Sequence, residues 1–125
     1  MSKPIRFNAF EMNCVAHQSP GLWRHPRDRS WQYKDVAYWT DLARILERGI
    51  FDAVFIADVI GYYDVYQGSN AAAFRGGVQI PVNDPLQLAN PIASVTQHLG
   101  IGITASTSFE HPYTFARRLA TADHH

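Results

Sequence analysis

The sequence predicts an α/β domain in which parallel strands alternate with helices that cover them. Two observations support this fold class. Three apolar runs typical of strands are separated by segments whose apolar residues recur at helical spacing. The central run, residues 49–59, is apolar at both alternating sets of positions, as expected of a parallel strand buried on both faces.

The composition excludes several classes of protein. The chain has 125 residues, enough for one domain, of which 46% are hydrophobic and 18% charged, so it is globular rather than disordered. The 11 Lys and Arg residues balance 11 Asp and Glu residues, so the charge predicts no nucleic acid or membrane partner. The single cysteine, Cys14, excludes an internal disulfide and fits a cytoplasmic protein. No long apolar segment follows the first basic residues, so we expect no signal peptide or membrane span.

The first half of the chain predicts two strands around a helix. Residues 5–12 are the first strand and residues 35–48 the first helix. Apolar residues recur at helical spacing in this helix: Val36, Trp39, Ala43 and Leu46. Gly49 is placed for a left-handed cap that ends the helix, and residues 49–59 follow as the second strand.

The second half predicts a helix, a strand and a further helix. Asn90 is a suitable N-cap, Pro91 a suitable first residue and Gly100 a suitable stop for the second helix. Residues 101–108 are the third strand, and residues 111–125 begin the third helix.

Long connections point to one edge of the predicted sheet. Residues 13–34 and 60–89 follow the carboxyl ends of the first two strands, and loops of this length in a compact domain are usually functional. Parallel α/β folds place their ligand sites at this edge. Asp58 ends the second strand there, where its carboxylate can meet a ligand. A structural aspartate that caps a nearby loop is the alternative.

Four further residues are candidates for a site. Thr104 and Ser106 share one face of the third strand and can direct hydroxyls to the same edge, although Ser and Thr also end strands for structural reasons. In the first loop, Trp23 and His25 offer a flat apolar surface and a titratable imidazole, either for a ligand or for packing within the loop. We predict no metal site, and the pair at positions 124 and 125 does not indicate one.

Three stretches together resemble a known family. They are LWRHP at residues 22–26, LERGIFDAVFIADV at residues 46–59 and GITASTSFEHPYTFARRLATADHH at residues 102–125. This combination resembles the bacterial-luciferase-like flavin monooxygenases, in the branch that contains nitrilotriacetate monooxygenase and dibenzothiophene-sulfone monooxygenase. The resemblance covers nearly the whole chain.

The resemblance implies a fold, a reaction and a set of site residues. It implies a TIM (β/α)8 barrel and an FMN-dependent two-component monooxygenase, in which a separate flavin reductase supplies reduced FMN and O2 oxygenates a small organic substrate. On this resemblance Asp58, and Thr104 or Ser106, match positions that contact FMN. Trp23 and His25 would line the flavin and substrate side, with His25 as the candidate catalytic residue. A full-length form would be a homo-oligomer.

Members of this family run to several hundred residues. The resemblance therefore predicts that residues 1–125 form one partial domain, the three N-terminal βα units of an incomplete luciferase-like TIM barrel, and that this chain alone is inactive. Its sheet would turn Val54, Ile56 and Ile101 or Ile103 toward the barrel interior. Two alternatives stay open. One is a truncated, non-catalytic fragment or binding module of the family, and the other is a small doubly wound flavodoxin-like domain.

Overall fold

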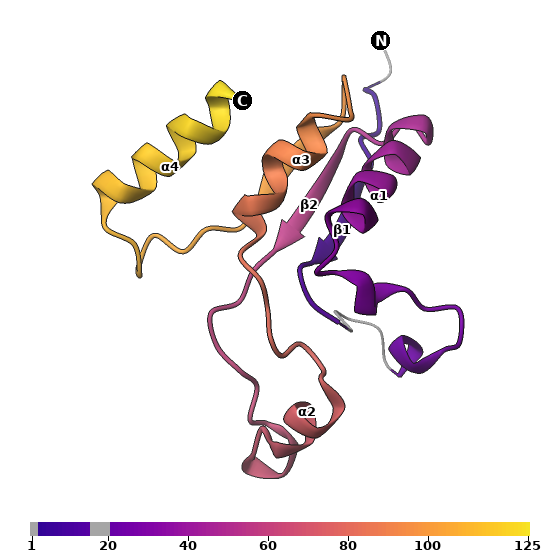
Figure 1. Cartoon of the computed structure of the whole chain (residues 1–125), viewed down its shortest axis with the longest axis vertical. Coiled ribbons are helices and arrows are strands. Elements are labelled where there is room, and N and C mark those ends of the chain that lie inside the picture. The colour runs from indigo at the N-terminus through magenta and orange to yellow at the C-terminus, as the bar shows by residue number, and fades with distance from the viewer. Residues whose placement is uncertain (1–2, 16–20) are drawn as a thin grey trace.

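The computed structural model describes residues 3–15 and 21–125. Its centre is a sheet of three parallel strands in the order β1–β2–β3, which are Asn8–Met12, Ala53–Ala57 and Gly100–Ile103. Four α-helices are described: α1 Val36–Arg48, α2 Ala71–Gly76, α3 Ala89–Ala93 and α4 Pro112–His124. The helices α1 and α3 lie against the sheet, α2 belongs to the long loop after β2, and α4 stands apart (Figure 1). The predicted alternation of parallel strands and helices is confirmed.

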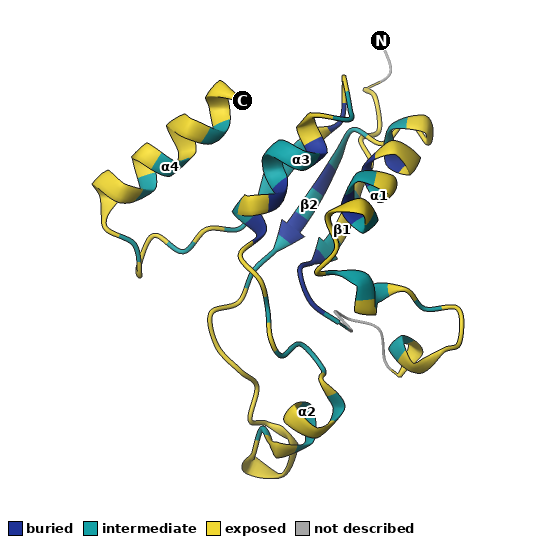
Figure 2. Cartoon of the chain, in the orientation of Figure 1, coloured by how far each residue is buried: buried dark blue, intermediate teal, exposed yellow. Residues whose placement is uncertain are grey.

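The hydrophobic core lies between the sheet and the helices α1 and α3. Val54 and Ile56 of β2 are buried, and Trp39 of α1 and Ile92 of α3 are buried with them in one cluster. Figure 2 shows the buried residues gathered where these helices meet the sheet. The Trp39 indole donates to the carbonyl of Tyr33 at 2.6 Å, so the one polar atom of this large core side chain is satisfied.

The prediction that Val54 and Ile56 face the barrel interior is wrong. Both pack beneath α1 and α3, and Ile101 is in register with Val54 and packs against the same cluster. The opposite face of the sheet carries Phe10 and Phe55, whose rings stack with centroids 5.5 Å apart. Because β2 is apolar at both sets of positions, its pattern alone does not reveal which set the helices cover.

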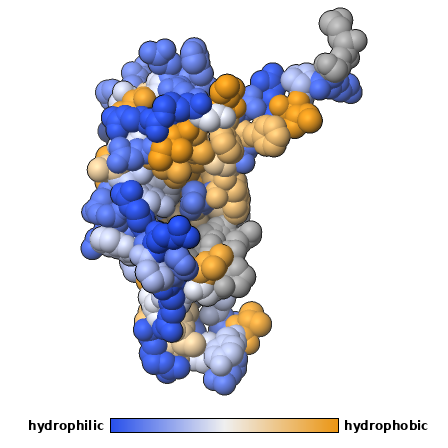
Figure 3. Space-filling model, turned by 90° about the vertical axis from the view of Figure 1, so that its right-hand side faces the viewer, coloured by the Kyte–Doolittle hydropathy of each residue, from blue (hydrophilic) through white to orange (hydrophobic). Residues whose placement is uncertain are grey.

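Gly102 makes room for the aromatic pair on this second face. A Cβ at Gly102 would lie 3.1 Å from Cδ2 of Phe55, closer than side chains normally approach. The N-terminal segment is apolar and open to solvent, since Ile5, Phe7 and Phe10 are 79%, 61% and 48% exposed. Figure 3 shows hydrophobic side chains along this segment beside a largely hydrophilic surface.

Asp52 joins the amino ends of all three strands. Its backbone N–H donates to the carbonyl of Phe7 at 2.9 Å, and its carboxylate accepts from the Phe7 N–H at 2.8 Å and from Nη1 of Arg6 at 2.6 Å. Its carbonyl accepts from the N–H of Gly100 at 2.9 Å. Asp52 therefore holds the start of β2 to the segments that open β1 and β3.

Glu47 makes a second connection at this end of the molecule. Its Oε1 atom accepts from the backbone N–H groups of Gln97 and His98, both at 2.6 Å, and of Leu99 at 3.3 Å. The hydrogen bonds from His98 and Gln97 lower the pKa of Glu47. This carboxylate holds the last turn of α1 to the segment that leads into β3.

The end of α1 differs from the prediction by one residue. Gly49 has φ −76°, whereas Ile50 has φ 59° and takes the left-handed conformation. The N–H of Phe51 donates to the carbonyl of Leu46 and the N–H of Ile50 to that of Glu47, which is the hydrogen-bond pattern of a Schellman motif. Gly49 is thus the C-cap, and the position that usually takes glycine holds isoleucine.

The predicted second helix begins earlier and is shorter. Asp84 caps a 3-10 turn, Pro85–Leu88, by accepting from the N–H of Leu86 at 2.9 Å, and α3 continues directly from it. Asn90 consequently lies inside α3 instead of capping it. Gly100 is the first residue of β3 rather than a helix stop, because its N–H pairs with Asp52.

The strand β3 is shorter than predicted and ends at Ile103. The N–H of Thr104 donates to the carbonyl of Ile56 at 3.0 Å. The neighbouring strand β2 ends at Ala57, one residue after Ile56. Thr104 and Ser106 therefore follow the strand instead of lying within it.

Candidate functional site

A pocket of about 480 Å³ lies at the carboxyl edge of the sheet. Three segments line it. The first is residues 58–62 after β2, the second is Pro81, Val82 and Asp84 ahead of α3, and the third contributes Glu110 and Arg118. The pocket is therefore built from chain segments that follow β2, precede α3 and form α4.

Asp58 is the residue of this pocket that the strand pattern predicts. It follows β2 directly, is partly buried, and has its pKa raised by burial and, to a lesser extent, by the charge of Asp84. The N–H of Val59 donates to its carboxylate. Within the described residues no side chain donates to Asp58, so its carboxylate keeps room to accept hydrogen bonds from a ligand.

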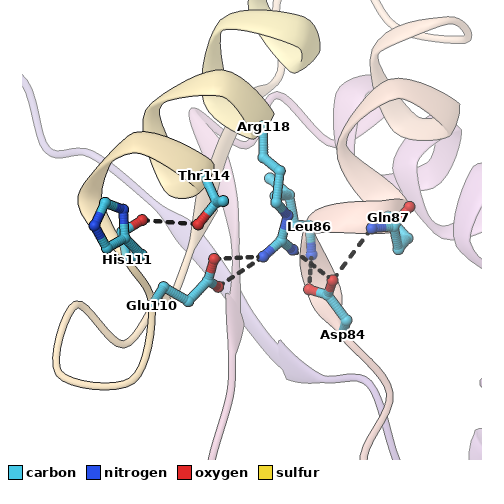
Figure 4. A network of polar contacts seen from close by, with 7 residues as sticks. All are labelled: Asp84, Leu86, Gln87, Glu110, His111, Thr114 and Arg118. Atoms are coloured by element: carbon cyan, nitrogen blue, oxygen red, sulfur yellow. Dashed lines mark hydrogen bonds and ion pairs between the residues drawn. The ribbon is translucent and has the colours of Figure 1, made fainter.

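The other two carboxylates of the pocket are occupied by one guanidinium. Nη1 of Arg118 lies 2.7 Å from both carboxylate oxygens of Glu110, and Nη2 lies 2.7 Å from Oδ2 of Asp84 (Figure 4). Asp84 also accepts from the N–H of Leu86 at 2.9 Å and from the side-chain amide of Gln87 at 3.2 Å. Asp58 is thus the carboxylate of this pocket that remains open.

A second pocket, of about 640 Å³, adjoins the first. Val59, Gly61, Tyr62 and Val82 line both pockets, and Met12 and residues from the α2 region complete the second. Its lining among the described residues contains no Asp, Glu, Lys, Arg or His. This second pocket therefore offers an uncharged, mainly apolar surface next to the carboxylate of Asp58.

Thr104 and Ser106 lie at the same edge of the sheet as Asp58, because parallel neighbouring strands end together. Both are partly buried, and the carbonyl of Ser106 accepts from the N–H of Phe109 at 3.4 Å. Neither lines the two pockets among the described residues. Their contact with FMN remains a prediction.

Trp23 and His25 lie in the first loop, away from the lining of both pockets. The Trp23 ring packs beside the end of α2, with an atom 3.6 Å from where a Cβ would stand on Gly76, and the Arg24 guanidinium lies 4.8 Å from its centre. His25 is exposed, and its Nδ1 accepts from the N–H of Arg27 at 3.2 Å. The substrate-side and catalytic roles of these two residues remain predictions.

The sequence did not predict the burial or pairing of several residues at this edge of the sheet. Asn13 is 3% exposed, and its Oδ1 has no hydrogen-bond partner among the described residues. Cys14 is equally buried, which raises the pKa of its thiol to about 11. The burial of Asn13 and Cys14 cannot be read from the spacing of apolar residues, because both follow the end of a strand. The ion pair between Asp84 and Arg118 has no fixed spacing in the sequence either.

The described residues give two further findings about partners. Within residues 3–15 and 21–125, no group of three or more His, Cys, Asp and Glu side chains is arranged to hold a metal ion. None of the helices in those ranges combines the length and the apolar character that a membrane crossing requires.

Comparison with known proteins identifies the family. The long-chain alkane monooxygenase of Geobacillus thermodenitrificans (strain NG80-2) is 57% identical over 124 residues, which are 99% of this chain and 28% of that protein. The dimethyl-sulfide monooxygenase of Hyphomicrobium sulfonivorans is 55% identical over 124 residues, 99% of this chain and 26% of that protein. A crystal structure of long-chain alkane monooxygenase superposes with a TM-score of 0.93 over 98% of this chain and 28% of its own, at 57% identity. The chain belongs to the bacterial-luciferase-like flavin monooxygenases.

More distant members of the luciferase-like family match in the same way. Component A of nitrilotriacetate monooxygenase from Aminobacter aminovorans is 34% identical over 110 residues, which are 83% of this chain and 24% of that protein. A crystal structure of riboflavin lyase with modified FMN and riboflavin has a TM-score of 0.85 and 34% identity, covering 97% of this chain and 27% of that one. No family model matches the chain. The chain spans about a quarter of the length of the curated relatives it matches.

Proposed function

We propose that this chain supplies the first three βα units of a (β/α)8 barrel in an FMN-dependent two-component monooxygenase. In this proposal reduced FMN and O2 oxygenate a small organic substrate. The observation that carries it is the open carboxylate of Asp58 beside a large uncharged pocket, in a chain of the luciferase-like family. The protein would act in the cytoplasm as a homo-oligomer.

Asp58 is the residue that would hold FMN through hydrogen bonds. Its pocket contains three carboxylates and one guanidinium, and two of the carboxylates are already paired with that guanidinium. Such a pocket repels a phosphate but suits the hydroxyl and N–H donors of a flavin. Thr104 and Ser106 would add hydroxyl contacts from the next strand end, and residues outside this pocket would bind the phosphate.

The second pocket favours an uncharged substrate. A carboxylated substrate buried there would find no cationic side chain among the described lining residues, and an unpaired buried charge is costly. The relatives include one named for an uncharged thioether, dimethyl-sulfide monooxygenase at 55% identity, and one named for a polycarboxylate, nitrilotriacetate monooxygenase component A at 34% identity. The uncharged lining supports a small apolar molecule, such as an alkane or a thioether, over a polycarboxylate.

In this proposal the pocket of Asp58 would bind the flavin and the second pocket would bind the substrate. Bound reduced FMN supplies two electrons, with which one atom of O2 enters the substrate and the other leaves as water. Met12, Val59 and Tyr62 would exclude bulk water from the substrate side, and Asp58 would orient the flavin. A separate flavin reductase would regenerate reduced FMN, in line with the name component A of one relative.

An aspartate substitution tests the proposed flavin site. In the protein that contains this chain, Asp58→Ala should weaken reduced-FMN binding by about tenfold, because it removes a charged, partly buried hydrogen-bond acceptor from the pocket. Its unfolding temperature should change little. Anaerobic titration with reduced FMN measures the affinity, and Asp64→Ala, an exposed loop aspartate that lines neither pocket, is the matched control.

Two outcomes would count against the proposal. Unchanged affinity of the Asp58→Ala variant would return Asp58 to the role of a loop-capping residue. Absence of turnover with a flavin reductase, O2 and a panel of alkanes, thioethers and polycarboxylates would favour the alternative, a non-catalytic fragment or binding module of the same family.

A further inference from the structure

The helix α4 is joined to the rest of the molecule by very few contacts. None of its residues is buried, and it stands away from the sheet and from α3 (Figures 1 and 2). Among the described residues, the pair of Arg118 with Asp84 is the only side-chain hydrogen bond from α4 to the segment that leads into α3. The placement of α4 over the pocket therefore depends strongly on this one contact.

Both partners of this contact are themselves held in place. Asp84 accepts from the N–H of Leu86 and the side-chain amide of Gln87, which fix its carboxylate at the start of the 3-10 turn. Arg118 is held on its other side by both oxygens of Glu110. Figure 4 shows the guanidinium lying between the two carboxylates. A planar guanidinium with several donors suits this fixed geometry better than an ammonium group would.

The same pairing determines which carboxylate of the pocket stays open. Asp58, Asp84 and Glu110 all line the pocket, and Arg118 is the only basic residue among its described lining. The guanidinium of Arg118 binds Glu110 and Asp84, and none of its hydrogen bonds among the described residues goes to Asp58. Asp58 is then left to accept hydrogen bonds from a ligand.

We propose that Arg118 is a positioning residue of the flavin pocket. By bridging Glu110 and Asp84 it fixes α4 as one wall of the pocket and leaves Asp58 as the open acceptor. This inference rests on the proposed function, because it assigns the pocket to FMN. Exposed ion pairs add little to global stability, so loss of Arg118 should disturb the pocket much more than the fold.

Substitution of Arg118 in the protein that contains this chain tests the inference. Arg118→Gln should weaken reduced-FMN binding about tenfold, with an unfolding temperature close to that of the wild type. Arg118→Lys, which keeps the charge but loses the fork of donors, should recover part of the affinity. Arg117→Gln is the matched control, because its side chain forms no ion pair among the described residues. Anaerobic titration gives the affinities.

A double-mutant cycle separates bridging from a general effect of charge. Asp84→Asn keeps the cap on Leu86 but loses the charged partner of Arg118. If the two residues act as one bridge, the double variant should bind FMN about as well as Arg118→Gln alone. Additive losses, or wild-type affinity in Arg118→Gln, would overturn the inference. Failure of the wild type to bind reduced FMN would instead overturn the proposed function, and the inference with it.

Discussion

Three carboxylates share the pocket at the carboxyl edge, and each has a different environment. Glu110 is bound on both oxygens by Arg118, and Asp84 receives three donors. Asp58 receives the N–H of its neighbour Val59, and burial raises its pKa. Ionisation is therefore least compensated at Asp58, so donors from a ligand have most to contribute there.

The thiol of Cys14 should be unreactive in the folded protein. Burial raises its pKa to about 11, with further contributions from the charges of Glu11 and Asp58. At mildly alkaline pH only about one thiol in a thousand is then ionised. We expect iodoacetamide to modify Cys14 slowly in buffer and quickly in denaturant, as followed by mass spectrometry. The chain has a single cysteine, so rapid labelling in buffer would contradict this prediction directly.

Ile50 should be replaceable by glycine with a gain in stability. Its φ of 59° is unfavourable for a β-branched residue, and its side chain is 87% exposed, so it loses no packing. Ile50→Gly should raise the free energy of unfolding by up to about 1 kcal/mol, after the entropy of glycine is subtracted. Chemical denaturation measures the change.

The matched control is Ile45→Gly within α1, where Ile45 is 56% exposed. Glycine inside a helix should lower stability by about 0.5–1 kcal/mol relative to a good helix former. Equal effects of the two substitutions would show that backbone conformation does not decide the outcome at position 50.

Strand ends predicted Asp58, but no comparable signal predicted Arg118. Asp58 follows an apolar run directly, so its place at the sheet edge can be inferred from the sequence. Arg118, Asp84 and Glu110 come from separate segments, and their pairing depends on the three-dimensional course of the loops. Contacts of this kind have no fixed spacing along the chain.

At the scale of elements, the Glu47 contact should make stability depend on pH. Its pKa is lowered in the folded state by the N–H groups of His98 and Gln97. The contribution of a carboxylate with a lowered pKa is present above its unfolded value, near 4.5, and is lost as the pH falls through its folded value. Glu47→Gln should therefore be less stable than the wild type at neutral pH.

The difference between Glu47→Gln and the wild type should shrink as the solution is acidified. Urea midpoints of both proteins across the acidic range would show this convergence. A difference that stays constant down to the lowest pH would mean that the charge of Glu47 does not matter. Asp41→Asn is a suitable control, because Asp41 is exposed and pairs with Arg44 on its own helix.

Helix and strand ends were predicted less well than the elements themselves. The apolar spacing of α1 agrees with the observed Val36–Arg48, because its buried face is continuous. The start of the second helix was predicted too late, because Asp84 and Pro85 begin a helical turn ahead of the predicted cap Asn90. Both positions carry a local capping signal, and in the structure it is Asp84 that caps, ahead of a turn whose Pro85 and Leu88 are buried.

At the scale of the whole molecule, we expect the 125-residue chain to self-associate when produced alone. The outer edges of β1 and β3 have no partner strand among the described residues, and Ile5 and Phe7 are largely exposed. Exposed strand edges and apolar side chains favour association. Light scattering, circular dichroism and an oxygenation assay with a flavin reductase would test this.

In these assays we expect an associated species, a broad unfolding transition and no flavin-dependent turnover. A monomer with a sharp transition and flavin-dependent turnover would contradict the prediction of a partial barrel. A monomer without turnover would show that the core on the helix-covered face of the sheet is enough to stabilise the chain. That core contains Trp39, Ile56 and Ile92.

The overall architecture was the most predictable level, apart from the orientation of the sheet. Apolar runs that alternate with segments of helical spacing identified three parallel strands and their helices. The run AVFIA in β2 is apolar at every position, so its pattern does not predict which face of the sheet α1 and α3 cover. That choice depends on volume and packing, with Val54 and Ile56 fitting beneath the helices.

The hydrogen bonds of Asp52 have a consequence for how such a sequence can change over time. They fix the alignment of all three strands at their amino ends, opposite the edge where the long loops emerge. Insertions or deletions in the loop after Asp58 therefore leave the strand alignment intact. The loops that form the pockets can therefore change in length and sequence while the arrangement of the strands beneath them stays the same.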